Sequence, residues 1–472
     1  MRIVIVGGGI AGLSVAWAVR RRDPSADVVV LERGPRAGGN VRTEYADGYT
    51  CECGPDGFLD SAAATLRLAR EVGLEWRLLP SNDAAKRRYI FLKGRLHEVP
   101  GSPAAFLRSS LLSVRGKARV AWEPFARPQP EEDESIYDFA TRRIGSEAAS
   151  ALIDSLISGI FAGDAHALSL RACAPKIWQL ENDHGGLLRA RLATWRRHRR
   201  NEAPNASAGR LTSFVGGMTE LTDTLTRSLD RAVRTATPAL RLRKGCGTDG
   251  CRSAAAARGY TVETQAGSIR ADAVVLAGLA SESAALMRPF DPTIASLLDG
   301  IPTAPLAVLC LGYDAAAVGT CCALDGFGFL VPRSERIRIL CALWETSIYS
   351  HRAPAGKALL RVMIGGACDR DVVSLSDEAL IGIARRDLAR TMRLSIAPEF
   401  VKIIRHSRGI PQYVKGHLAR LRRIDASLQA HARLYLAGQS YRGGSITACI
   451  ADADRVAASV LEHARAASEH VP

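Results

Sequence analysis

Short apolar runs recur along the chain and predict buried strands. Residues 2–6 and 27–31 are β-branched runs of the kind found in parallel strands, and residues 13–19 continue as a helix between them. Residues 271–277 and 433–438 repeat the buried-strand pattern much later in the chain. Strands that alternate with helices indicate an α/β fold with a parallel sheet. The segments that form this sheet are separated in sequence by long stretches that belong elsewhere.

A glycine-rich turn joins the first predicted strand to the first helix and fits the G-x-G-x-x-G spacing. Gly7 permits the tight turn, Gly9 lets the backbone approach a pyrophosphate, and Gly12 allows the helix to pack closely on the strand. The helix N-terminus offers free N–H groups to phosphates, and Glu32, which ends the second strand, can accept hydrogen bonds from a ribose. The sequence therefore predicts a dinucleotide site whose turn comprises Gly7, Gly9, Ile10, Ala11 and Gly12.

The residues that follow Glu32 indicate which dinucleotide binds. Residues 32–39 read Glu-Arg-Gly-Pro-Arg-Ala-Gly-Gly and resemble the E-x-x-x-R-x-G-G pattern of FAD-dependent amine oxidases and their relatives. In that pattern the glycine pair passes against the ribityl-pyrophosphate, and the arginine helps to neutralise phosphate charge. FAD is therefore the expected cofactor, in contact with Arg33, Arg36, Gly38, Gly39 and Asn40.

A second G-x-G-x-x-G occurs at residues 245–250, but no acid-ended strand follows about twenty residues later. We interpret it as a turn between strands, because a dinucleotide site needs that strand and its acid. No second nucleotide site for NAD(P)H is evident. Dioxygen or a quinone is therefore the expected electron acceptor.

Three domains are expected: a Rossmann-type FAD-binding domain, a mixed-sheet substrate domain and an inserted helical domain. Residues 97–207 are helical and strongly basic at their end. Residues 79–96 and 280–415 alternate short strands with turns and one helix at 377–394, which indicates the substrate domain. The FAD-binding domain takes the remaining segments, 1–78, 208–279 and 416–472, with further helices predicted at residues 61–72, 219–229 and 446–461.

The chain carries 63 Lys and Arg against 48 Asp and Glu, which gives a net charge of +15. This excess favours an anionic partner (nucleic acid, a membrane surface or an acidic small molecule), unless it reflects a basic proteome. Nucleic acid is the least favoured, since no aromatic-rich recognition module accompanies the charge. Apolar and basic side chains interleave over residues 106–125, which leaves contact with a membrane surface open beside a solvated face.

No membrane span, export signal or metal site is indicated. The longest apolar runs fall short of the about 20 residues that a spanning helix needs, and the chain starts directly in a strand. The 11 cysteines show neither metal-ligand spacing nor a disulfide framework. These features predict a cytoplasmic protein with reduced thiols, and peripheral attachment to the inner face of the membrane is the open alternative.

Most of the chain, from about residue 3 to residue 460, resembles the flavin-dependent porphyrinogen oxidases of haem biosynthesis. Residues 158–164 (Ser-Gly-Ile-Phe-Ala-Gly-Asp) and 409–413 (Gly-Ile-Pro-Gln-Tyr) are the most diagnostic, because general amine oxidases lack them. Further resembling segments are residues 54–59, 86–89, 326–332 and 416–417.

The resemblance implies an oxygen-dependent FAD oxidoreductase that converts protoporphyrinogen IX to protoporphyrin IX. Coproporphyrinogen III is the alternative substrate, because both compounds carry propionates and differ only in their peripheral groups. The implied partners are the tetrapyrrole, dioxygen and either a membrane surface or the next enzyme of haem synthesis. The protein is expected to be a monomer or a homodimer.

The resemblance also assigns roles to side chains. Arg88 matches an arginine that anchors a substrate propionate, although a surface arginine is the alternative. Asp56 falls near the reacting ring and is the candidate catalytic residue, as an orienting or proton-accepting group. For the apolar positions a plain core role is the alternative. The implied macrocycle wall comprises Phe327, Gly328, Leu330 and Met363.

Further cofactor contacts follow from the resemblance, and three positions near the flavin depart from the family pattern. Ala448 replaces an Asp, His406 stands where relatives carry a Trp, and Ala239 replaces a Val. These departures favour, as an alternative, a paralogous oxidase or desaturase acting on another apolar ring. A non-catalytic flavin- or tetrapyrrole-binding protein of a haem-handling complex is a further open alternative. The implied contacts are Gly54, Pro55, Asp56, Gly57, Ala239, His406, Gly438, Gly444, Ser445 and Ile446.

Overall fold

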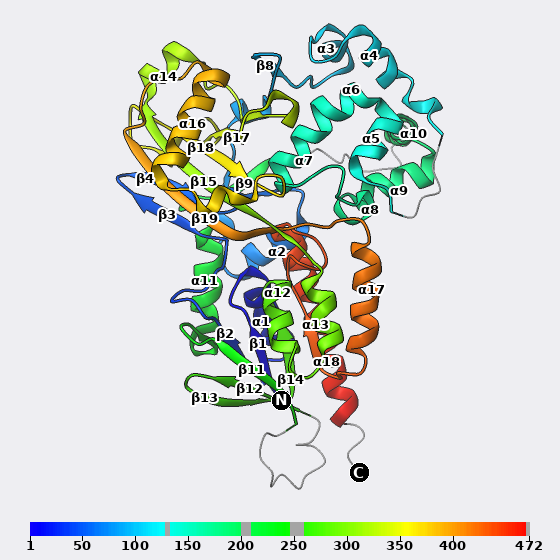
Figure 1. Ribbon diagram of the computed structural model, residues 1–472. Helices are drawn as coiled ribbons and strands as arrows, with labels where there is room; N and C mark the ends of the chain where they lie inside the picture. The colour runs from blue at the N-terminus through cyan, green and yellow to red at the C-terminus, as the bar shows by residue number, and fades with distance from the viewer. Residues whose placement is uncertain (128–132, 200–208, 246–258, 469–472) are drawn as a thin grey trace.

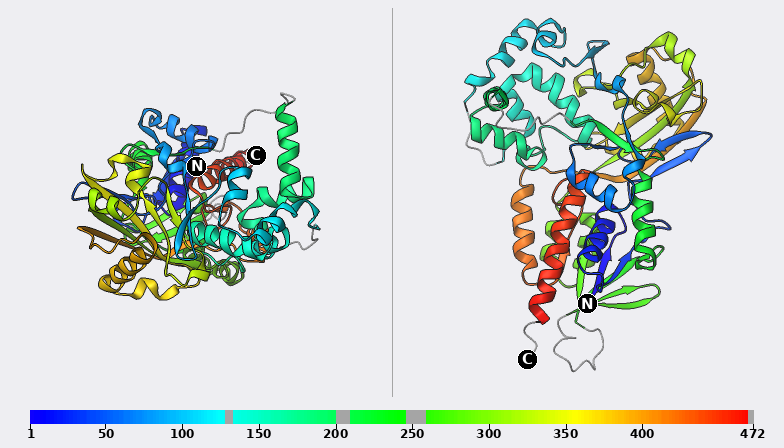
Figure 2. Two further views of the ribbon diagram at one scale, coloured as in Figure 1. Left: turned by 90° about the horizontal axis from the view of Figure 1, so that it is seen from above. Right: turned by 180° about the vertical axis from the view of Figure 1, so that it is seen from behind.

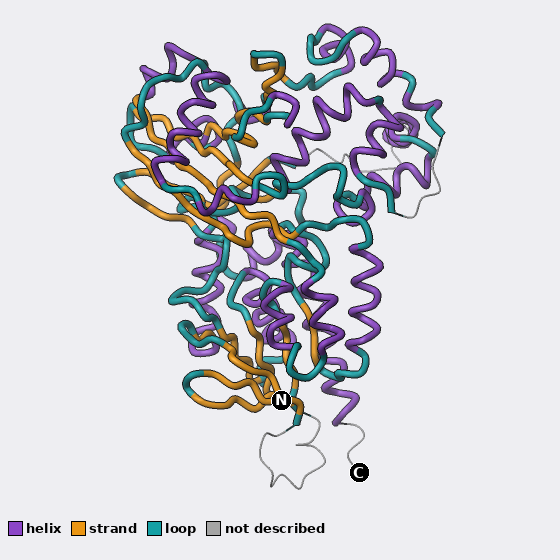
Figure 3. Tube along the Cα trace, viewed as in Figure 1, coloured by secondary structure: helices purple, strands orange, loops and turns teal. Residues whose placement is uncertain are grey.

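The computed structural model describes residues 1–127, 133–199, 209–245 and 259–468. One end of the molecule holds a parallel sheet between helices, and the other end carries a large mixed sheet beside a group of helices (Figures 1 and 2). The secondary structure in Figure 3 shows the same division into a strand-rich and a helix-rich half at that end. The second glycine-rich motif extends beyond residue 245 and lies outside the described residues.

A five-stranded parallel sheet forms the centre of the first part, in the order β10-β2-β1-β14-β20. The prediction of an α/β fold with a parallel sheet is confirmed, because four of these strands coincide with the predicted apolar runs to within two residues. Their bounds are β1 Arg2–Val6, β2 Asp27–Leu31, β10 Val233–Arg234, β14 Ala273–Leu276 and β20 Leu434–Leu436.

Helices cover both faces of this sheet because its strands bury side chains on both sides. Ile3 and Ile5 pack against one group of helices, whereas Val4 packs against the other. The first group comprises α1 Ile10–Arg22, α2 Ala63–Glu71, α11 Thr219–Leu229 and α18 Ile446–Ser468. The second group comprises α12 Ala280–Met287, α13 Pro292–Asp299 and α17 His417–Leu428.

The prediction of a single helix and short strands in residues 280–415 is wrong. Helices α12 and α13 begin this segment and pack on the parallel sheet through Ala284, Ile294 and Leu298. Strands β15 and β19 each run for twelve residues. Local pattern could not show this, because the packing partners of α12 and α13 come from all along the chain, from Val4 on β1 to Leu436 on β20. The predicted domain boundaries stay a prediction.

The seven-stranded mixed sheet has the order β19-β15-β18-β17-β16-β7-β8. Its neighbours are antiparallel except for β16 and β7, which pair in parallel. Helix α16 packs on one face, and the other face turns toward the rest of the molecule. The elements are β7 Tyr89–Leu92, β8 Arg95–Glu98, β15 Thr303–Asp314, β16 Gly328–Leu330, β17 Ile339–Trp344, β18 Lys357–Gly365, β19 Phe400–Pro411, α14 Ala315–Cys321, α15 Glu345–Ile348 and α16 Asp377–Met392.

The described part of the chain also contains three small antiparallel sheets. They are formed by β3 Thr43–Ala46 with β4 Tyr49–Glu52, by β9 Leu211–Phe214 between β5 Phe58–Leu59 and β6 Leu78–Pro80, and by β11 Ala239–Lys244, β12 Tyr260–Thr264 and β13 Gly267–Ala271. The helical insertion contains α3 Pro103–Arg108, α4 Val114–Ala121, α5 Ile136–Ile144, α6 Ser146–Ala148, α7 Asp154–Phe161, α8 Leu170–Cys173, α9 Pro175–His184 and α10 Leu187–Arg199.

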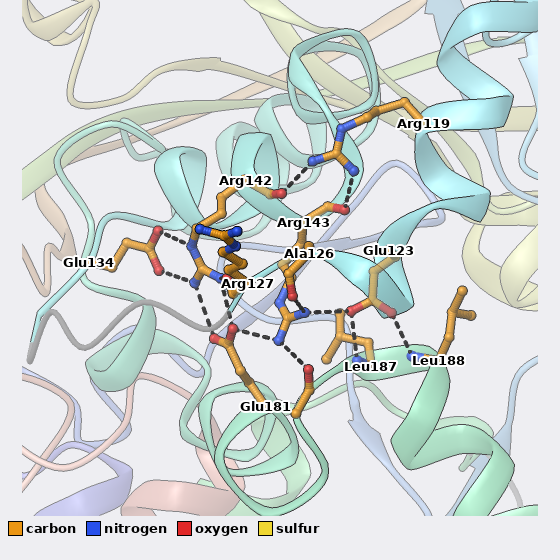
Figure 4. Close-up of polar contacts among 11 residues, drawn as sticks. Arg119, Glu123, Ala126, Arg127, Glu134, Arg142, Arg143, Glu181, Leu187 and Leu188 are labelled. Carbon is orange, nitrogen blue, oxygen red and sulfur yellow. Dashed lines mark hydrogen bonds and ion pairs between the residues drawn. The ribbon is translucent and has the colours of Figure 1, made fainter.

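A buried set of ion pairs holds the helical insertion together (Figure 4). Arg142 on α5 pairs with Glu134 at 2.6 Å and with Glu181 on α9 at 2.8 Å. The fully buried Arg143 pairs with Glu181 at 2.6 Å, and Glu123 accepts hydrogen bonds from the first two N–H groups of α10. Charged side chains thus fix the insertion from inside.

Apolar side chains are exposed on the outer edge of the insertion, over part of the interleaved segment 106–125. Leu107, Val114, Trp122 and Phe125 are 61–83% exposed, whereas their neighbours Leu111 and Leu112 are buried. No helix in the described part of the chain is long and apolar enough to cross a bilayer.

Candidate active site

The first glycine turn is built so that side chains would not fit. Gly7 has φ +110°, a region that favours glycine. A Cβ on Gly12 would lie 2.0 Å from the Gly7 carbonyl oxygen, and a Cβ on Gly39 would lie 3.2 Å from Gly9 Cα. The two glycine segments therefore meet backbone to backbone at the start of α1, as a closely approaching pyrophosphate requires.

Among the described residues no side chain caps the N-terminus of α1, because the N-cap residue is Gly9, so its first N–H groups are available to a ligand. Glu32 at the end of β2 accepts hydrogen bonds from the N–H groups of Gly8, at 2.9 Å, and Gly34, at 2.7 Å. These contacts fix its carboxylate beside the turn. The geometry offers a positive helix end to phosphates and an acidic acceptor to a ribose, and it fits FAD.

A cavity of about 2180 Å³ runs from this turn to the seven-stranded sheet. It brings together most of the site residues that the sequence predicts. Those lining it are Gly7, Gly9, Ile10, Ala11, Glu32, Arg33, Gly38, Gly39, Asn40, Gly54, Pro55, Asp56, Gly57, Ala239, Phe327, Leu330, Met363, His406, Gly438, Gly444, Ser445 and Ile446.

Four predicted residues do not line the cavity. Gly12 lies behind the turn, where it packs against Gly7. Gly328 has φ +127°, and a Cβ there would lie 2.1 Å from the Ala342 carbonyl oxygen, so it serves the pairing of β16 with β17. The Arg36 guanidinium turns to α11, where it donates to the Thr219 hydroxyl at 3.2 Å.

The fourth of these residues, Arg88, is exposed beside the cavity. Its guanidinium stands 5.5 Å from the centre of the Phe327 ring, and that ring lines the cavity. The stacked cation therefore lies at the rim of the apolar part, where it can meet a carboxylate of a molecule bound inside.

The apolar part of the cavity lies between the seven-stranded sheet and α7. Leu330 on β16 approaches Gly159 so closely that a Cβ on the glycine would lie 2.4 Å from its side chain. Met363 on β18 and Phe327 line the same region and are only partly buried. This slot suits a flat apolar ring, and it gives the motif at residues 158–164 a place at the site.

His406 adopts a fixed orientation in the cavity wall. Its Nε2 lies 2.7 Å from the Cys53 carbonyl oxygen, so Nε2 carries the proton. Burial lowers the pKa of His406, which keeps its ring neutral at neutral pH. A neutral polar ring therefore occupies this part of the cavity wall.

The N-terminus of α18 reaches the cavity through a second glycine turn. Gly443 has φ +109°, and a Cβ on it would lie 2.6 Å from the Ala448 Cβ. Ser445 accepts the Ala448 N–H at 3.1 Å and so caps the helix. The Gly443 N–H donates to the Tyr413 hydroxyl at 2.9 Å. The unusual Ala448 therefore fits a turn whose backbone still faces the cofactor region.

Behind Asp56 lies a buried charge cluster that the sequence analysis missed. Arg361 on β18 pairs with Asp56 at 2.6 Å and with Glu345 at 3.1 Å. Arg352 pairs with Glu52 at 2.7 Å, and both side chains are fully buried. The one available signal was Arg361 itself, a cation in the middle of the apolar strand over residues 358–364.

Basic side chains outnumber acidic ones on the cavity wall. Among the described residues that line it, eight are Lys or Arg and four are Asp or Glu. Such a wall favours anionic ligands, including a pyrophosphate and ring carboxylates. The cations are Arg33, Arg171, Lys176, Arg361, Arg405, Arg408, Arg422 and Arg442, and the anions are Glu32, Asp56, Glu282 and Asp425.

Comparison with known proteins agrees with this geometry. The model of the flavin containing amine oxidoreductase family matches residues 10–461. A coproporphyrinogen III oxidase from Bacillus subtilis is 31% identical over 465 residues, which cover 95% of each chain. A protoporphyrinogen oxidase from Homo sapiens is 31% identical over 479 residues, which cover 97% of this chain and 98% of its own.

Solved structures show the same fold. A crystal structure from Exiguobacterium sp. 255-15, assigned as a protoporphyrinogen oxidase, superimposes with a TM-score of 0.82 at 28% identity and covers 98% of this chain and 99% of its own. Cyclohexylamine oxidase from Brevibacterium oxydans shares the fold at 18% identity, with a TM-score of 0.70 and the same coverage of each chain. With its glycine cradle and its near full-length matches, this chain belongs to the flavin-containing amine oxidoreductase family, in the group that includes the protoporphyrinogen and coproporphyrinogen III oxidases.

Proposed function

We propose that this protein oxidises a porphyrinogen to the corresponding porphyrin, with dioxygen as the final electron acceptor. Protoporphyrinogen IX is the favoured substrate. The observation that carries the proposal is that the FAD cradle and an apolar slot with a cation at its rim share one cavity. A porphyrinogen is an apolar ring with carboxylates at its edge, and both features have a counterpart here.

The protein's main contribution to this reaction is to orient the substrate and to exclude water from the site. Leu330, Met363 and Phe327 hold the ring in the slot, and Arg88 anchors a propionate at the rim. Bound FAD, held by the glycine turn of Gly7, Gly9 and Gly39, would supply the hydride acceptor for a bridging carbon of the ring, and the aromaticity of the product would favour the reaction. Asp56 is the proposed acceptor for the proton that a pyrrole N–H loses.

Coproporphyrinogen III is the second candidate, and one observation favours it. Arg171 on α8 and Lys176 on α9 also line the cavity. Coproporphyrinogen III carries four propionates where protoporphyrinogen IX carries two, so it can use these additional cations.

Membrane contact is a further proposal, carried by the exposed side chains of Leu107, Val114, Trp122 and Phe125. A protein with these side chains next to basic residues can lie on an anionic bilayer. Flotation with vesicles of anionic and of neutral lipid tests this proposal. A protein that does not float with either type of vesicle contradicts it.

The deciding experiment compares aerobic turnover of the two porphyrinogens by the FAD-loaded protein, followed by porphyrin fluorescence against an autoxidation control without protein. Turnover above the control identifies the substrate, and the ratio of kcat/KM values ranks the two candidates. Traces that match the control, while the protein holds yellow FAD, refute the proposed function and favour the paralogous oxidase or the non-catalytic binder.

A further inference from the structure

The charge cluster behind Asp56 contains more carboxyl groups than cations. Its three carboxyls belong to Glu52, Asp56 and Glu345, and its two guanidiniums to Arg352 and Arg361. Each of these side chains is at most 7% exposed. Because a buried charge without a partner is costly, the excess carboxyl is expected to hold a proton instead of a charge.

The contacts show which carboxyl that is. Glu52 accepts hydrogen bonds from the Thr43 hydroxyl at 2.8 Å, the Met218 N–H at 2.9 Å and Arg352 at 2.7 Å, as an ionised carboxylate does. Glu345 has no such donors among the described residues. Both of its oxygens are buried without a hydrogen bond, and its one ion-pair contact is with Arg361 Nε at 3.1 Å.

Asp56 and Glu345 share the Arg361 guanidinium, Asp56 at Nη2 and Glu345 at Nε, so the two carboxyl groups are neighbours and influence each other's charge. Asp56 receives the better contact, 2.6 Å from Arg361 Nη2, and its other oxygen, Oδ1, is buried without a partner. Two ionised carboxylates here would repel each other, whereas one proton between them forms a hydrogen bond. Asp56 lines the cavity, and Glu345 lies behind it.

We propose that Glu345 stays protonated and donates its O–H to Asp56, so that Asp56 remains an ionised proton acceptor at the substrate wall. This inference rests on the proposed porphyrinogen oxidation. The pyrrole N–H bond breaks and its proton passes to Asp56, while the two electrons leave the substrate with the hydride from the bridging carbon. The pair then holds two protons until one passes to solvent. Glu345 is a positioning residue in this scheme.

The other titratable groups around Glu345 fit this assignment. Burial, followed by the neighbouring Asp56 carboxylate, raises the pKa of Glu345 far above its usual value, although Arg361 and Arg352 oppose the shift. Burial raises the pKa values of Tyr349 and Cys341, and the hydrogen bond with Cys51, followed by burial, raises the pKa of Cys310, so these groups are neutral at neutral pH.

Infrared spectroscopy of the FAD-loaded protein tests the protonation state without any turnover. The C=O stretching band of a protonated carboxyl lies at a higher frequency than the carboxylate bands, and it shifts when the exchangeable proton is replaced by deuterium in heavy water. We expect such a band at neutral pH in the wild type and in the surface control Glu399→Gln, and its loss in Glu345→Gln. Absence of the band, or a band that persists in Glu345→Gln, overturns the assignment.

The direction of a pH shift tests the role at the site. If Glu345 donates a hydrogen bond that stabilises negative charge at the site, Glu345→Leu removes that donor and moves the acid limb of kcat/KM to higher pH. If Glu345 is ionised, the same change removes a negative charge and moves the limb to lower pH, which overturns the proposal. Glu345→Gln keeps a donor and should leave the limb in place, and it also serves if the Leu variant fails to fold.

The two proposals fail in different ways. If neither porphyrinogen is turned over while the Glu345-dependent infrared band is present, the proposed function falls, and with it the role of Asp56 toward the substrate. If turnover is normal while the band is missing, the porphyrinogen oxidase stands and the Glu345 proton is refuted.

Discussion

Removal of Arg352 should destabilise the protein strongly, and more so at high pH. Arg352 pairs with Glu52 at 2.7 Å and donates to the Ser213 hydroxyl at 3.1 Å, and both charged side chains are fully buried. Arg352→Met leaves the Glu52 carboxylate inside the protein without its cation. Breaking a buried pair in this way costs about 3–5 kcal/mol, whereas loss of an exposed pair costs about 0–1 kcal/mol.

The pH dependence follows from the pKa of Glu52. Burial raises this pKa, whereas Arg352 and the N–H of Met218 lower it, so loss of Arg352 raises it further. A carboxyl whose folded-state pKa exceeds its unfolded value, about 4.3, stabilises the fold below that value. This contribution is lost as the pH rises through the folded-state pKa. The deficit of Arg352→Met should therefore be larger at pH 8 than at pH 5.

Urea unfolding at both pH values measures this deficit as the loss in free energy of unfolding. Arg288→Met is the matched control, since Arg288 pairs with Asp299 at 2.6 Å but is 57% exposed. In the double variant Arg352→Met/Glu52→Gln, most of the lost stability should return because position 52 no longer carries a buried charge without its cation. A loss no larger than that of the control, or a loss that is greater at pH 5, would refute the reasoning.

Three further substitutions test the cofactor and substrate sites. In Gly12→Ala the new Cβ would lie 2.0 Å from the Gly7 carbonyl oxygen, so the flavin absorbance of the purified protein should fall. In the control Gly382→Ala the new Cβ meets open space, and the flavin absorbance should stay at the wild-type value. Equal flavin content in the two variants contradicts this prediction. Arg88→Ala should raise KM for a porphyrinogen about 10-fold or more through loss of a charged hydrogen bond. The control Lys86→Ala, at an exposed neighbouring position, should leave KM unchanged. Equal KM values for the Arg88→Ala and Lys86→Ala variants argue against Arg88 as the anchor. Gly159→Ala should lower turnover without loss of FAD, because the new Cβ would lie 2.4 Å from the Leu330 side chain. Unchanged turnover would mean that Gly159 and Leu330 do not contact the substrate.

The cofactor half of the site could be predicted from sequence because its rules are local. Gly7 needs a positive φ, Gly12 needs close helix packing, and Glu32 must end the next strand, and all three conditions lie within one βαβ unit. The same applies to strands β1 and β2, because their continuous apolar runs identify them as buried strands from the local sequence alone. The cavity collects these residues as expected.

The charge cluster could not be predicted because its members are brought together only by the tertiary fold. Asp56 and Arg361 are 305 residues apart in sequence, and Glu52 and Arg352 are 300 apart. Neither spacing has a periodicity that a local pattern could reveal. Arg36 shows the converse, since its motif placed it at the phosphates while its guanidinium contacts α11.

The departures near the flavin were the main sequence argument for a different substrate, but the helix cap at one of them, Ala448, is complete without the Asp. A Cβ added to Gly443 would lie only 2.6 Å from the Ala448 Cβ, so this turn needs glycine at position 443 whichever side chain stands at position 448. Ser445 supplies the cap that a helix N-terminus needs, through the Ala448 N–H. The positive end of α18 therefore still faces the cofactor region without the Asp. An altered residue in this turn gives no reason by itself to expect an altered ring in the slot, which is formed by Leu330, Met363 and Gly159 on other elements.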